Sequence, residues 1–347
     1  MKIEKKEIGK NKTPFVIAEM SANHNGEIEN AFKIIKAAKN AGADAVKIQT
    51  YRPDTITLKS DAEEFRIQGG LWHGKTLYQL YEEAHTPWEW HKPMFDYARK
   101  IGIIIFSSPF DTTAVDLLED LNTPAYKIAS FEMVDIPLIK YVAKTGKPMI
   151  ISTGMAKVEE IQEAVDAART SGCKELAILH CVSGYPAPAD NYNLNTIPDM
   201  KRRFGVETGI SDHTIGNATA IAAVALGAVI IEKHFTLDRK AGGPDDSFSI
   251  EPKELKQLII DVKTAWQALG KIDYSCKPTE ENNIKYRRSL YFIKDMKAGD
   301  LISYETVRSV RPGYGLEPKY YEEIIGKKII TDVKANTPVE RSKIENK

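Results

Sequence analysis

The chain has 347 residues, which is enough for one large domain or for two domains. Its 48 Lys and Arg residues balance 48 Asp and Glu residues, so the charge gives no support for a nucleic-acid or membrane partner. The three cysteines lack metal-site spacing, the first residues lack an apolar signal core, and no run of about 18 apolar residues occurs. We therefore expect a cytoplasmic protein with reduced thiols.

Eight short apolar runs are predicted to be buried strands. They cover residues 15–20, 45–50, 103–109, 125–130, 148–154, 175–182, 206–213 and 229–236. Helical spacing occupies the intervals, for example residues 28–41, 87–100, 112–121, 137–145, 158–171, 215–225 and 254–269. Strand–helix alternation with a repeat of about 25 to 30 residues predicts a (β/α)8 TIM barrel, an α/β fold. A doubly wound open sheet is the alternative, but the Gly-rich fingerprint expected after its first strand is absent from the sequence.

One connection stands out by its length. Residues 51–87 are irregular in pattern and include the segment Gly69-Gly70-Leu71-Trp72. Connections of this length inside a compact domain are usually functional or an insertion.

The character of the sequence changes after Gly270. We place the barrel at residues 1–275, a polar linker at 276–288, and a small β-rich unit at 289–347. Within that unit, residues 295–300 are nearly repeated at 331–338. A unit of about 60 residues is marginal as an isolated domain, so we expect it to dock on another surface.

Two histidines, His213 and His234, stand where the seventh and eighth predicted strands end. The carboxyl ends of parallel strands meet on one face of the fold, where α/β proteins place their chemistry. Two neutral imidazoles on that face can bind a divalent cation. The alternative is that each ring caps or packs.

Two lysines, Lys47 and Lys127, fall inside apolar strands, where a buried ammonium group is costly unless it meets an anion. Hydroxyl side chains are predicted at the same strand ends: Ser108, Ser130, Ser152, Ser183 and Ser211. Together they indicate a positive, hydrogen-bonding site for phosphate or carboxylate. The alternative is that each lysine pairs with a core carboxylate such as Glu19 or Glu132.

Glu19 is the best candidate for a general base. It ends the first apolar strand, close to the predicted cation, where a carboxylate can orient or deprotonate water. The alternative is a carboxylate that holds a histidine tautomer. Asp245, in the loop after the eighth strand, could bind sugar hydroxyls or serve a turn.

These residues lie in motifs that resemble the sialic acid synthase family over essentially the whole chain. The matching motifs are residues 17–19, 22–26, 43–50, 126–130, 152–155, 209–214 and 232–235, and their order is highly specific. Within the family, residues 47–51, 69–72, 77–81 and 86–90 resemble the pseudaminic acid synthases. The C-terminal unit resembles the antifreeze-like (SAF) domain of the same family.

The resemblance implies an enzyme that condenses phosphoenolpyruvate with an open-chain amino sugar and releases phosphate by C–O cleavage, using manganese or magnesium. For the pseudaminate branch the sugar is 2,4-diacetamido-2,4,6-trideoxy-L-altrose. The implied metal ligands are His213 and His234, and the implied catalytic residues are Glu19 and Lys47.

The resemblance also assigns the substrate contacts. Phosphoenolpyruvate would be held by Lys47, Ser108, Lys127, Ser130, Ser152, Ser183 and Ser211. The sugar would face Gln49, Glu132, Tyr185, Asp245 and Arg311. In a domain-swapped homodimer, Arg311 would reach the sugar from the terminal domain of a partner chain.

One departure from the family pattern affects Ser183. Sialic acid synthases carry Cys-Thr-Asn where this chain has Cys181-Val182-Ser183, so an amide contact to phosphate is replaced by a hydroxyl or lost. The departure favours the pseudaminate branch. A synthase of N-acetylneuraminic or legionaminic acid is the nearer alternative. A non-catalytic sugar-binding protein is the alternative of another class.

Overall fold

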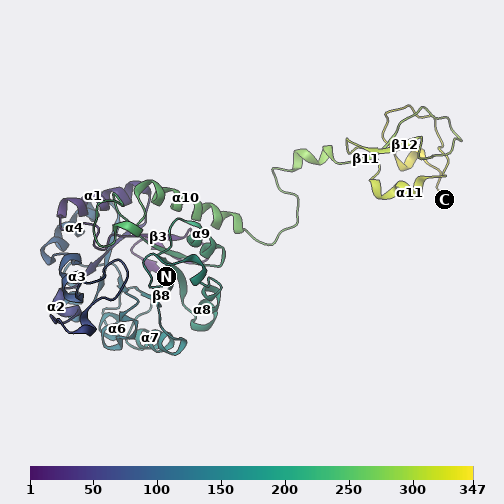
Figure 1. Cartoon of the computed structure of the whole chain (residues 1–347). Coiled ribbons are helices and arrows are strands. Elements are labelled where there is room, and N and C mark those ends of the chain that lie inside the picture. Colours follow the sequence, from purple (N-terminus) through teal and green to yellow (C-terminus); the bar gives the residue numbers. More distant parts are fainter. Residues whose placement is uncertain (347) are drawn as a thin grey trace. The chain divides into compact units, whose positions relative to one another are not determined.

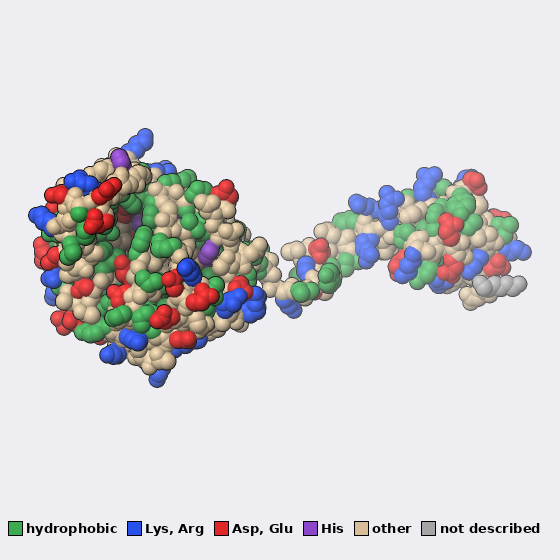
Figure 2. Space-filling model, turned by 60° about the horizontal axis from the view of Figure 1, so that its bottom comes forward, with side chains coloured by type: hydrophobic (Ala, Val, Ile, Leu, Met, Phe, Trp, Pro, Cys, Tyr) green, Lys and Arg blue, Asp and Glu red, His purple; other side chains and the backbone are tan. Residues whose placement is uncertain are grey.

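The computed structural model describes residues 1–346 and divides the chain into two compact units, Met1–Gly270 and Lys271–Lys347. In the face drawn in Figure 2, acidic and basic side chains are interspersed on both units, as expected from the balanced composition. Within the described residues, no helix is both long and apolar enough to cross a membrane.

The first unit is a closed barrel of parallel strands surrounded by helices (Figure 1). The order around the barrel is β10-β3-β4-β5-β6-β7-β8-β9. The strands are β3 (Phe15–Glu19), β4 (Ala45–Thr50), β5 (Ile104–Pro109), β6 (Tyr126–Ile128), β7 (Met149–Ser152), β8 (Leu176–Cys181), β9 (Glu207–Asp212) and β10 (Ile230–His234). The predicted (β/α)8 architecture is confirmed, and the open sheet is wrong because β10 pairs with β3.

The surrounding helices follow their strands in chain order. They are α1 (Ile28–Ala41), α4 (Trp88–Ile101), α5 (Thr112–Asp120), α6 (Ile136–Ala143), α7 (Val158–Thr170), α8 (Thr196–Phe204), α9 (Ala218–Ala225) and α10 (Pro252–Leu269). Their apolar faces and every second strand residue form one core cluster, which includes Val46, Ile48 and Phe95. This apolar layer packs the helices against the outer face of the barrel.

A second apolar cluster fills the lower part of the barrel interior. It contains the inward residues Phe15, Ile17, Ala45, Phe106, Ile150, Leu179 and Ile230. Ile3 and Ile8 join it from the hairpin of β1 (Lys2–Ile3) and β2 (Lys6–Glu7), which closes the amino-terminal end. Because successive strand residues alternate between the two clusters, the inward positions near the carboxyl ends can be read directly from this register.

The long connection after β4 contains two short helices, α2 (Pro53–Ile56) and α3 (Leu77–Ala84), and the 3-10 turn η1 (Glu63–Phe65). Helix α3 begins with a capping box, in which Gln79 N–H donates to Thr76 Oγ1 at 3.2 Å and Thr76 N–H donates to Gln79 Oε1 at 2.9 Å. The sequence pattern predicted only irregular structure here, because helices this short carry little periodicity.

The C-terminal unit has its own core, around Leu290, Phe292, Ile302 and Val307. Its elements are the antiparallel pair β11 (Ser289–Phe292) and β12 (Val307–Val310), helix α11 (Tyr321–Ile324) and several turns.

The near-repeat predicted in the C-terminal unit forms a reciprocal contact. Lys297 Nζ lies 2.7 Å from Asp332 Oδ2, and Lys334 Nζ lies 2.7 Å from Asp295 Oδ2. Each aspartate also accepts a backbone N–H from the other copy of the repeat. The repeated sequence therefore holds the two halves of the unit together.

Candidate active site

The barrel interior becomes polar at the next inward-facing position along each strand, beyond the apolar cluster. Each strand contributes one side chain to this level, which we call the polar ring: Glu19, Lys47, Ser108, Lys127, Ser152, Cys181, Ser211 and Glu232. All eight are buried. The ring lies at the carboxyl ends of the strands, the face on which enzymes with this fold carry their active sites.

Glu232 is the hub of the polar ring. Its Oε1 lies 3.0 Å from Lys47 Nζ and 2.9 Å from Lys127 Nζ. Its Oε1 also accepts a hydrogen bond of 3.0 Å from Ser211 Oγ. Lys47 Nζ lies a further 3.4 Å from Glu19 Oε2. The lysines therefore do pair with carboxylates, but the shared partner is Glu232, and Glu132 is not one of the partners.

The charges of the ring adjust to burial and to one another. Burial raises the pKa of Glu19 to about 7, against the opposing effect of the Lys47 ammonium group. Burial alone would also raise the pKa of Glu232, but Lys127 and Lys47 outweigh it and hold that pKa well below its usual value. Glu19 is therefore the carboxyl group of the ring that can exchange a proton near neutral pH.

Several hydroxyl groups around the lysines have unused hydrogen-bonding capacity. Ser108 Oγ and Ser152 Oγ are buried without a hydrogen-bond partner among the described residues. Ser130 Oγ and Ser183 Oγ lie 2.8 Å apart. Buried polar groups are normally paired, so unpaired hydroxyls beside two ammonium groups indicate a site for an anion.

Gly154 makes room for the serine pair. A Cβ atom at this position would lie 2.5 Å from Ser130 Cβ and 2.9 Å from Ser183 Oγ. Its backbone φ of 47° lies in the left-handed region, which glycine adopts without steric cost. The turn after β7 is therefore shaped around these two hydroxyls.

The two predicted metal-binding histidines lie together above the ring, with ring centroids 5.4 Å apart. His213 Nδ1 lies 2.7 Å from the Val182 carbonyl oxygen, which assigns the proton to Nδ1 and leaves Nε2 as an acceptor. Burial lowers the pKa of His213 to about 4 and also lowers the pKa of His234. Both rings are therefore neutral at pH 7, as metal ligands must be.

His234 has a further feature of a ligand. Its Nδ1 is buried and has no hydrogen-bond partner among residues 1–346, and it lies 3.9 Å from Asp245 Oδ2. No group of three or more His, Cys, Asp or Glu side chains in the described chain has the arrangement of a complete metal site. The donor set thus fits a divalent cation held by two imidazoles, with its other ligands from water or substrate.

An aromatic layer covers the histidines. The Tyr185 ring centroid lies 4.4 Å from that of His213 and 5.9 Å from that of His234. Trp72 packs against Tyr185 at 5.9 Å and donates its indole N–H to the Pro244 carbonyl oxygen at 3.0 Å. The long connection after β4 therefore reaches across the mouth of the barrel.

A cavity of about 380 Å³ opens above this site. Its polar lining includes Ser21, Gln49, Ser130, Glu132, Ser183, Tyr185, His234 and Asp245. The structure thus brings four of the five predicted sugar contacts into one cavity. The fifth, Arg311, is an exposed residue after β12 in the C-terminal unit.

A chain of hydrogen bonds connects the cavity to the polar ring. Gln49 Nε2 donates to Glu19 Oε1 and to Ser21 Oγ, both at 3.0 Å. Ser21 Oγ in turn donates to Asp245 Oδ2. Glu132 is not part of this chain of hydrogen bonds. Its Oε2 is buried and has no hydrogen-bond partner among the described residues, and burial raises the pKa of Glu132 to about 7.

Sequence reasoning missed three residues of the site. They are Glu232, Cys181 and Ser21, to which the sequence pattern assigns no role in the site. A strict count of every second residue would have found two of them, because Glu232 and Cys181 follow the inward residues Ile230 and Leu179. Ser21 lies beyond its strand, where that count no longer applies.

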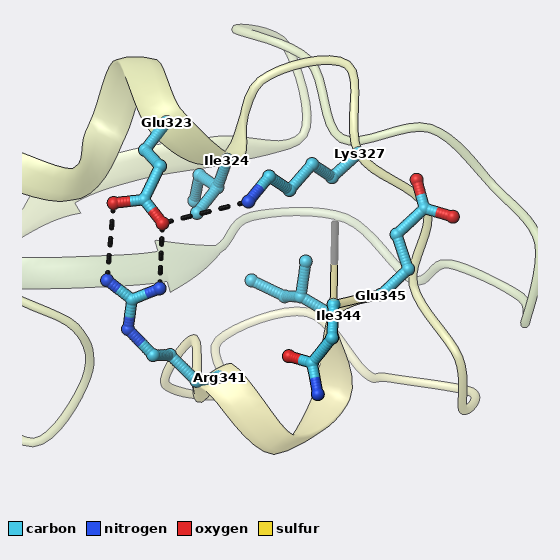
Figure 3. Close-up of a pocket in the computed structure, with 7 residues that line it drawn as sticks. Glu323, Ile324, Lys327, Arg341, Ile344 and Glu345 are labelled. Atoms are coloured by element: carbon cyan, nitrogen blue, oxygen red, sulfur yellow. Dashed lines mark hydrogen bonds and ion pairs between the residues drawn. The ribbon is translucent and has the colours of Figure 1, made fainter.

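A second cavity, of about 260 Å³, lies on the C-terminal unit (Figure 3). Its charged groups neutralise one another: Arg341 binds Glu323 through two hydrogen bonds of 2.7 and 3.2 Å, and Lys327 Nζ lies 3.6 Å from the same carboxylate. Unlike those of the polar ring, the described residues that line this cavity include no buried side-chain polar atom without a hydrogen-bond partner.

Comparison with known proteins agrees with this arrangement. The NeuB family model matches residues 34–274, and the SAF domain model matches residues 287–345. The chain is 47% identical to the pseudaminic acid synthase of Campylobacter jejuni, with 93% of this chain and 94% of that protein aligned. It is 44% identical to the pseudaminic acid synthase of Helicobacter pylori, with 96% and 98% aligned.

A solved structure is also similar. The N-acetylneuraminic acid synthetase of Leptospira borgpetersenii, determined in complex with citrate, is 31% identical and has a TM-score of 0.73. The alignment covers 82% of this chain and 94% of that one.

Proposed function

The chain belongs to the NeuB family and ends in a SAF domain, and from this premise we propose that it is a pseudaminic acid synthase. The reaction condenses phosphoenolpyruvate with 2,4-diacetamido-2,4,6-trideoxy-L-altrose and water, and it yields pseudaminic acid and phosphate. The observation that carries the proposal is the pair of buried lysines around Glu232, bordered by the unpaired hydroxyls of Ser108 and Ser152.

Phosphoenolpyruvate is proposed to bind over the polar ring. Lys127, Ser130, Ser152 and Ser211 hold its phosphate, with Ser108 and Ser183 beside them, and Lys47 lies on its carboxylate side. The two ammonium groups share the Glu232 carboxylate, and Lys47 alone also lies beside Glu19, so an arriving anion gains two strong donors. The unpaired serine hydroxyls supply further hydrogen bonds that cost no rearrangement.

Glu19 is proposed to act on the water. The methylene carbon of phosphoenolpyruvate attacks the sugar aldehyde, a carbon–carbon bond forms, the aldehyde oxygen takes up a proton, and positive charge develops on the neighbouring carbon that bears the phosphate oxygen. Glu19 takes a proton from the water that adds to this carbon. The carbon–oxygen bond to phosphate then breaks and its electron pair leaves with phosphate, while the newly added hydroxyl group loses its proton and becomes the keto group. A pKa of about 7 suits a carboxylate that accepts and returns a proton near neutrality.

His213 and His234 are the proposed ligands of manganese or magnesium, which as a Lewis acid would polarise the sugar aldehyde. The neutral state of both rings and the Val182 carbonyl that orients His213 support this assignment. On the sugar side, Gln49, Glu132, Tyr185 and Asp245 line the cavity and present carboxylate, amide and phenol groups.

We also propose a domain-swapped homodimer in which Arg311 of one chain reaches the sugar bound by the other. Exposed apolar side chains on the loops at the barrel mouth support a covering partner. Phe131 is 60% exposed, Met155 59% and Ile215 64%. A cytoplasmic location is proposed as well, because Cys173 and Cys181 are buried free thiols.

The alternative within the family is a synthase of N-acetylneuraminic or legionaminic acid. A panel of acceptor sugars, assayed for phosphate release from phosphoenolpyruvate with and without chelator, separates the possibilities. We expect release with the trideoxy-altrose acceptor and its loss with chelator. Release with another sugar alone would contradict the proposed substrate. No release with any sugar would favour a non-catalytic sugar-binding protein.

A further inference from the structure

The loop after β8, residues 182–195, holds His213 from outside its own strand. Three polar groups of His213 are bonded to this loop. Its ring Nδ1 lies 2.7 Å from the Val182 carbonyl oxygen, and its backbone carbonyl oxygen accepts from Ala187 N–H at 3.0 Å. Its backbone N–H donates to the Tyr192 hydroxyl oxygen at 2.7 Å. The direction in which His213 Nε2 points therefore depends on the loop after β8.

Tyr192 makes the one contact of these three that uses a side chain of the loop. Its hydroxyl also donates to the Ser211 carbonyl oxygen at 2.9 Å. A hydroxyl group has one proton to donate and lone pairs to accept with, so a single oxygen binds the backbone on both sides of Asp212. The two residues that it binds both face the site. Ser211 Oγ donates to Glu232 Oε1 at 3.0 Å and lies 3.5 Å from His213 Nε2.

Tyr192 is itself held in place. Its side chain is fully buried in the apolar layer between the strands and the helices. Its backbone carbonyl oxygen accepts a hydrogen bond from Nε2 of His180 on β8. The His180 ring also packs edge-on against the tyrosine ring, with the two centroids 5.9 Å apart. A ring that is close-packed in this way places its hydroxyl at a fixed point, against which the end of β9 can be held.

We propose that Tyr192 is a positioning residue of the active site, whose hydroxyl holds Ser211 and His213 in one geometry. The inference rests on the proposed function, which assigns Ser211 to the phosphate of phosphoenolpyruvate and His213 to the cation. Without the hydroxyl, the Ser211 carbonyl oxygen and the His213 N–H lose their common partner at buried positions, and the turn moves to pair them elsewhere. That movement displaces His213 Nε2 from the position that suits a cation.

Tyr192→Phe tests the proposal, because it removes one oxygen atom and keeps the ring. We expect the variant to bind Mn²⁺ about 10- to 100-fold more weakly than the wild type, the range for loss of a contact that orients a metal ligand. Electron paramagnetic resonance of free Mn²⁺ measures the affinity. The Mn²⁺ concentration for half-maximal phosphate release should rise by the same factor, and saturating Mn²⁺ should restore kcat, as expected for lost binding rather than lost chemistry.

The same variant should also affect the anion side of the site. Ser211 belongs to the turn that Tyr192 holds, so calorimetric titration should show weaker binding of phosphoenolpyruvate, by up to about 10-fold. Hydrogen exchange of residues 211–214, followed by mass spectrometry, should be faster than in the wild type. Unchanged affinity for both Mn²⁺ and phosphoenolpyruvate in the folded variant would overturn the proposal.

Tyr126→Phe is the matched control. Tyr126 is another fully buried tyrosine of the barrel, and its hydroxyl donates to Glu119 Oε1 at 2.6 Å, with the Val115 carbonyl oxygen 3.3 Å away. Both partners lie on α5, outside the site. Each variant should lower the midpoint of denaturant unfolding, whereas Tyr126→Phe should keep the wild-type affinity for Mn²⁺. Equal weakening of Mn²⁺ binding in both variants would overturn the proposal, because the cause would then be a general loss of stability.

Binding measurements need no turnover, so they separate this proposal from the proposed function. If no sugar supports phosphate release, the proposed reaction fails, while weaker Mn²⁺ binding confined to Tyr192→Phe still supports the positioning role. If the wild type binds no Mn²⁺, the metal assignment fails and the affinity for phosphoenolpyruvate decides. A loss confined to Tyr192→Phe then supports the proposal, and equal affinity, or binding of neither ligand by the wild type, overturns it.

Hydrogen exchange of the wild type keeps the proposal testable if Tyr192→Phe does not fold. The His213 amide lies beyond the end of β9, at Asp212, so the strand ladder does not account for its protection. We expect this amide to exchange as slowly as the amides within β9, because Tyr192 binds it. Fast exchange at His213 would overturn the proposal.

Discussion

Two buried charge clusters lie on opposite faces of the same strand, β10, one residue apart. On the outer face, Lys233 Nζ lies 2.7 Å from Asp212 Oδ2 and donates to the Thr214 carbonyl oxygen at 2.7 Å. Asp212 Oδ1 accepts from Thr214 N–H at 2.9 Å and from its hydroxyl at 2.7 Å. On the inner face, Glu232 binds Lys47 and Lys127 in the polar ring.

The two clusters are equally buried, yet their hydrogen bonding differs. Every oxygen of Asp212 is paired, so the outer cluster is complete within the chain. In the inner cluster, Glu19 Oε2, Ser108 Oγ and Ser152 Oγ have no hydrogen-bond partner among the described residues. Burial of charge alone therefore does not identify an active site, whereas unused hydrogen-bonding capacity beside buried charge does.

Lys127→Met should give the largest loss of activity. A small loss would contradict the comparison between the inner and outer clusters. The substitution removes one of two ammonium groups from the proposed anion site and leaves the outer pair intact. We expect kcat/KM for phosphoenolpyruvate to fall by at least about 10³-fold, at the upper end for loss of one electrostatic donor. Steady-state phosphate release measures it. A loss smaller than tenfold would remove Lys127 from the site.

Glu19→Gln should reduce kcat by at least about 10²-fold while phosphoenolpyruvate still binds. In the wild type, turnover should decline as the pH falls below about 7, because protonated Glu19 cannot accept a proton. Normal turnover in the variant would exclude Glu19 as the base.

The same variant should change stability in a defined pH window. Burial raises the pKa of Glu19 from 4.5 to about 7, so the folded state holds a proton that the unfolded state releases between these values. The wild type therefore loses stability relative to Glu19→Gln as the pH rises through this window. Denaturant titrations at pH 4.5 and pH 8 measure the free energy of unfolding of both proteins. If the wild type does not lose stability relative to Glu19→Gln between these two pH values, the assignment is contradicted.

Lys233→Met should produce the opposite profile to Lys127→Met. It leaves Asp212 buried without its cation, so the free energy of unfolding should fall by about 3 kcal/mol. The polar ring is untouched, and the folded variant should keep KM for phosphoenolpyruvate within about twofold, as expected for a site outside the binding contacts. Denaturant unfolding and steady-state kinetics on one preparation give both values. A large rise in KM would show that the outer cluster is part of the site.

Ser152→Ala should give the smallest effect. Removal of an unpaired buried hydroxyl should leave the free protein unchanged or more stable by up to about 1 kcal/mol. One lost hydrogen bond to charged phosphate should raise KM for phosphoenolpyruvate by about 10-fold. A destabilised variant with an unchanged KM would place Ser152 in the scaffold.

The sequence was sufficient for the barrel and for most residues at its mouth. In strand runs such as residues 45–50, the inward lysine alternates with outward aliphatic residues. Local alternation therefore predicts both the strand and the direction of each side chain. The same pattern was too weak for α2 and α3, whose 4 and 8 residues make only about one and about two turns.

The carboxylate partner of each buried lysine could not be derived from local alternation. Lys127 and Glu232 are 105 residues apart, and their contact depends on the stagger of a closed barrel. For the same reason, Lys233 and Asp212 could not be separated from the inner cluster by chemistry alone. Their outward direction follows from strand register, since they lie one position from Glu232 and Ser211.

Direct titration with phosphoenolpyruvate tests the central claim, that the inner cluster is the anion site and the outer cluster is scaffold. Calorimetry on wild type, Lys127→Met and Lys233→Met, each shown to be folded, compares the two clusters without turnover. We predict binding to the wild type and to Lys233→Met, and at least about 10²-fold weaker binding to Lys127→Met. Equal affinity of the wild type and Lys127→Met would contradict the account.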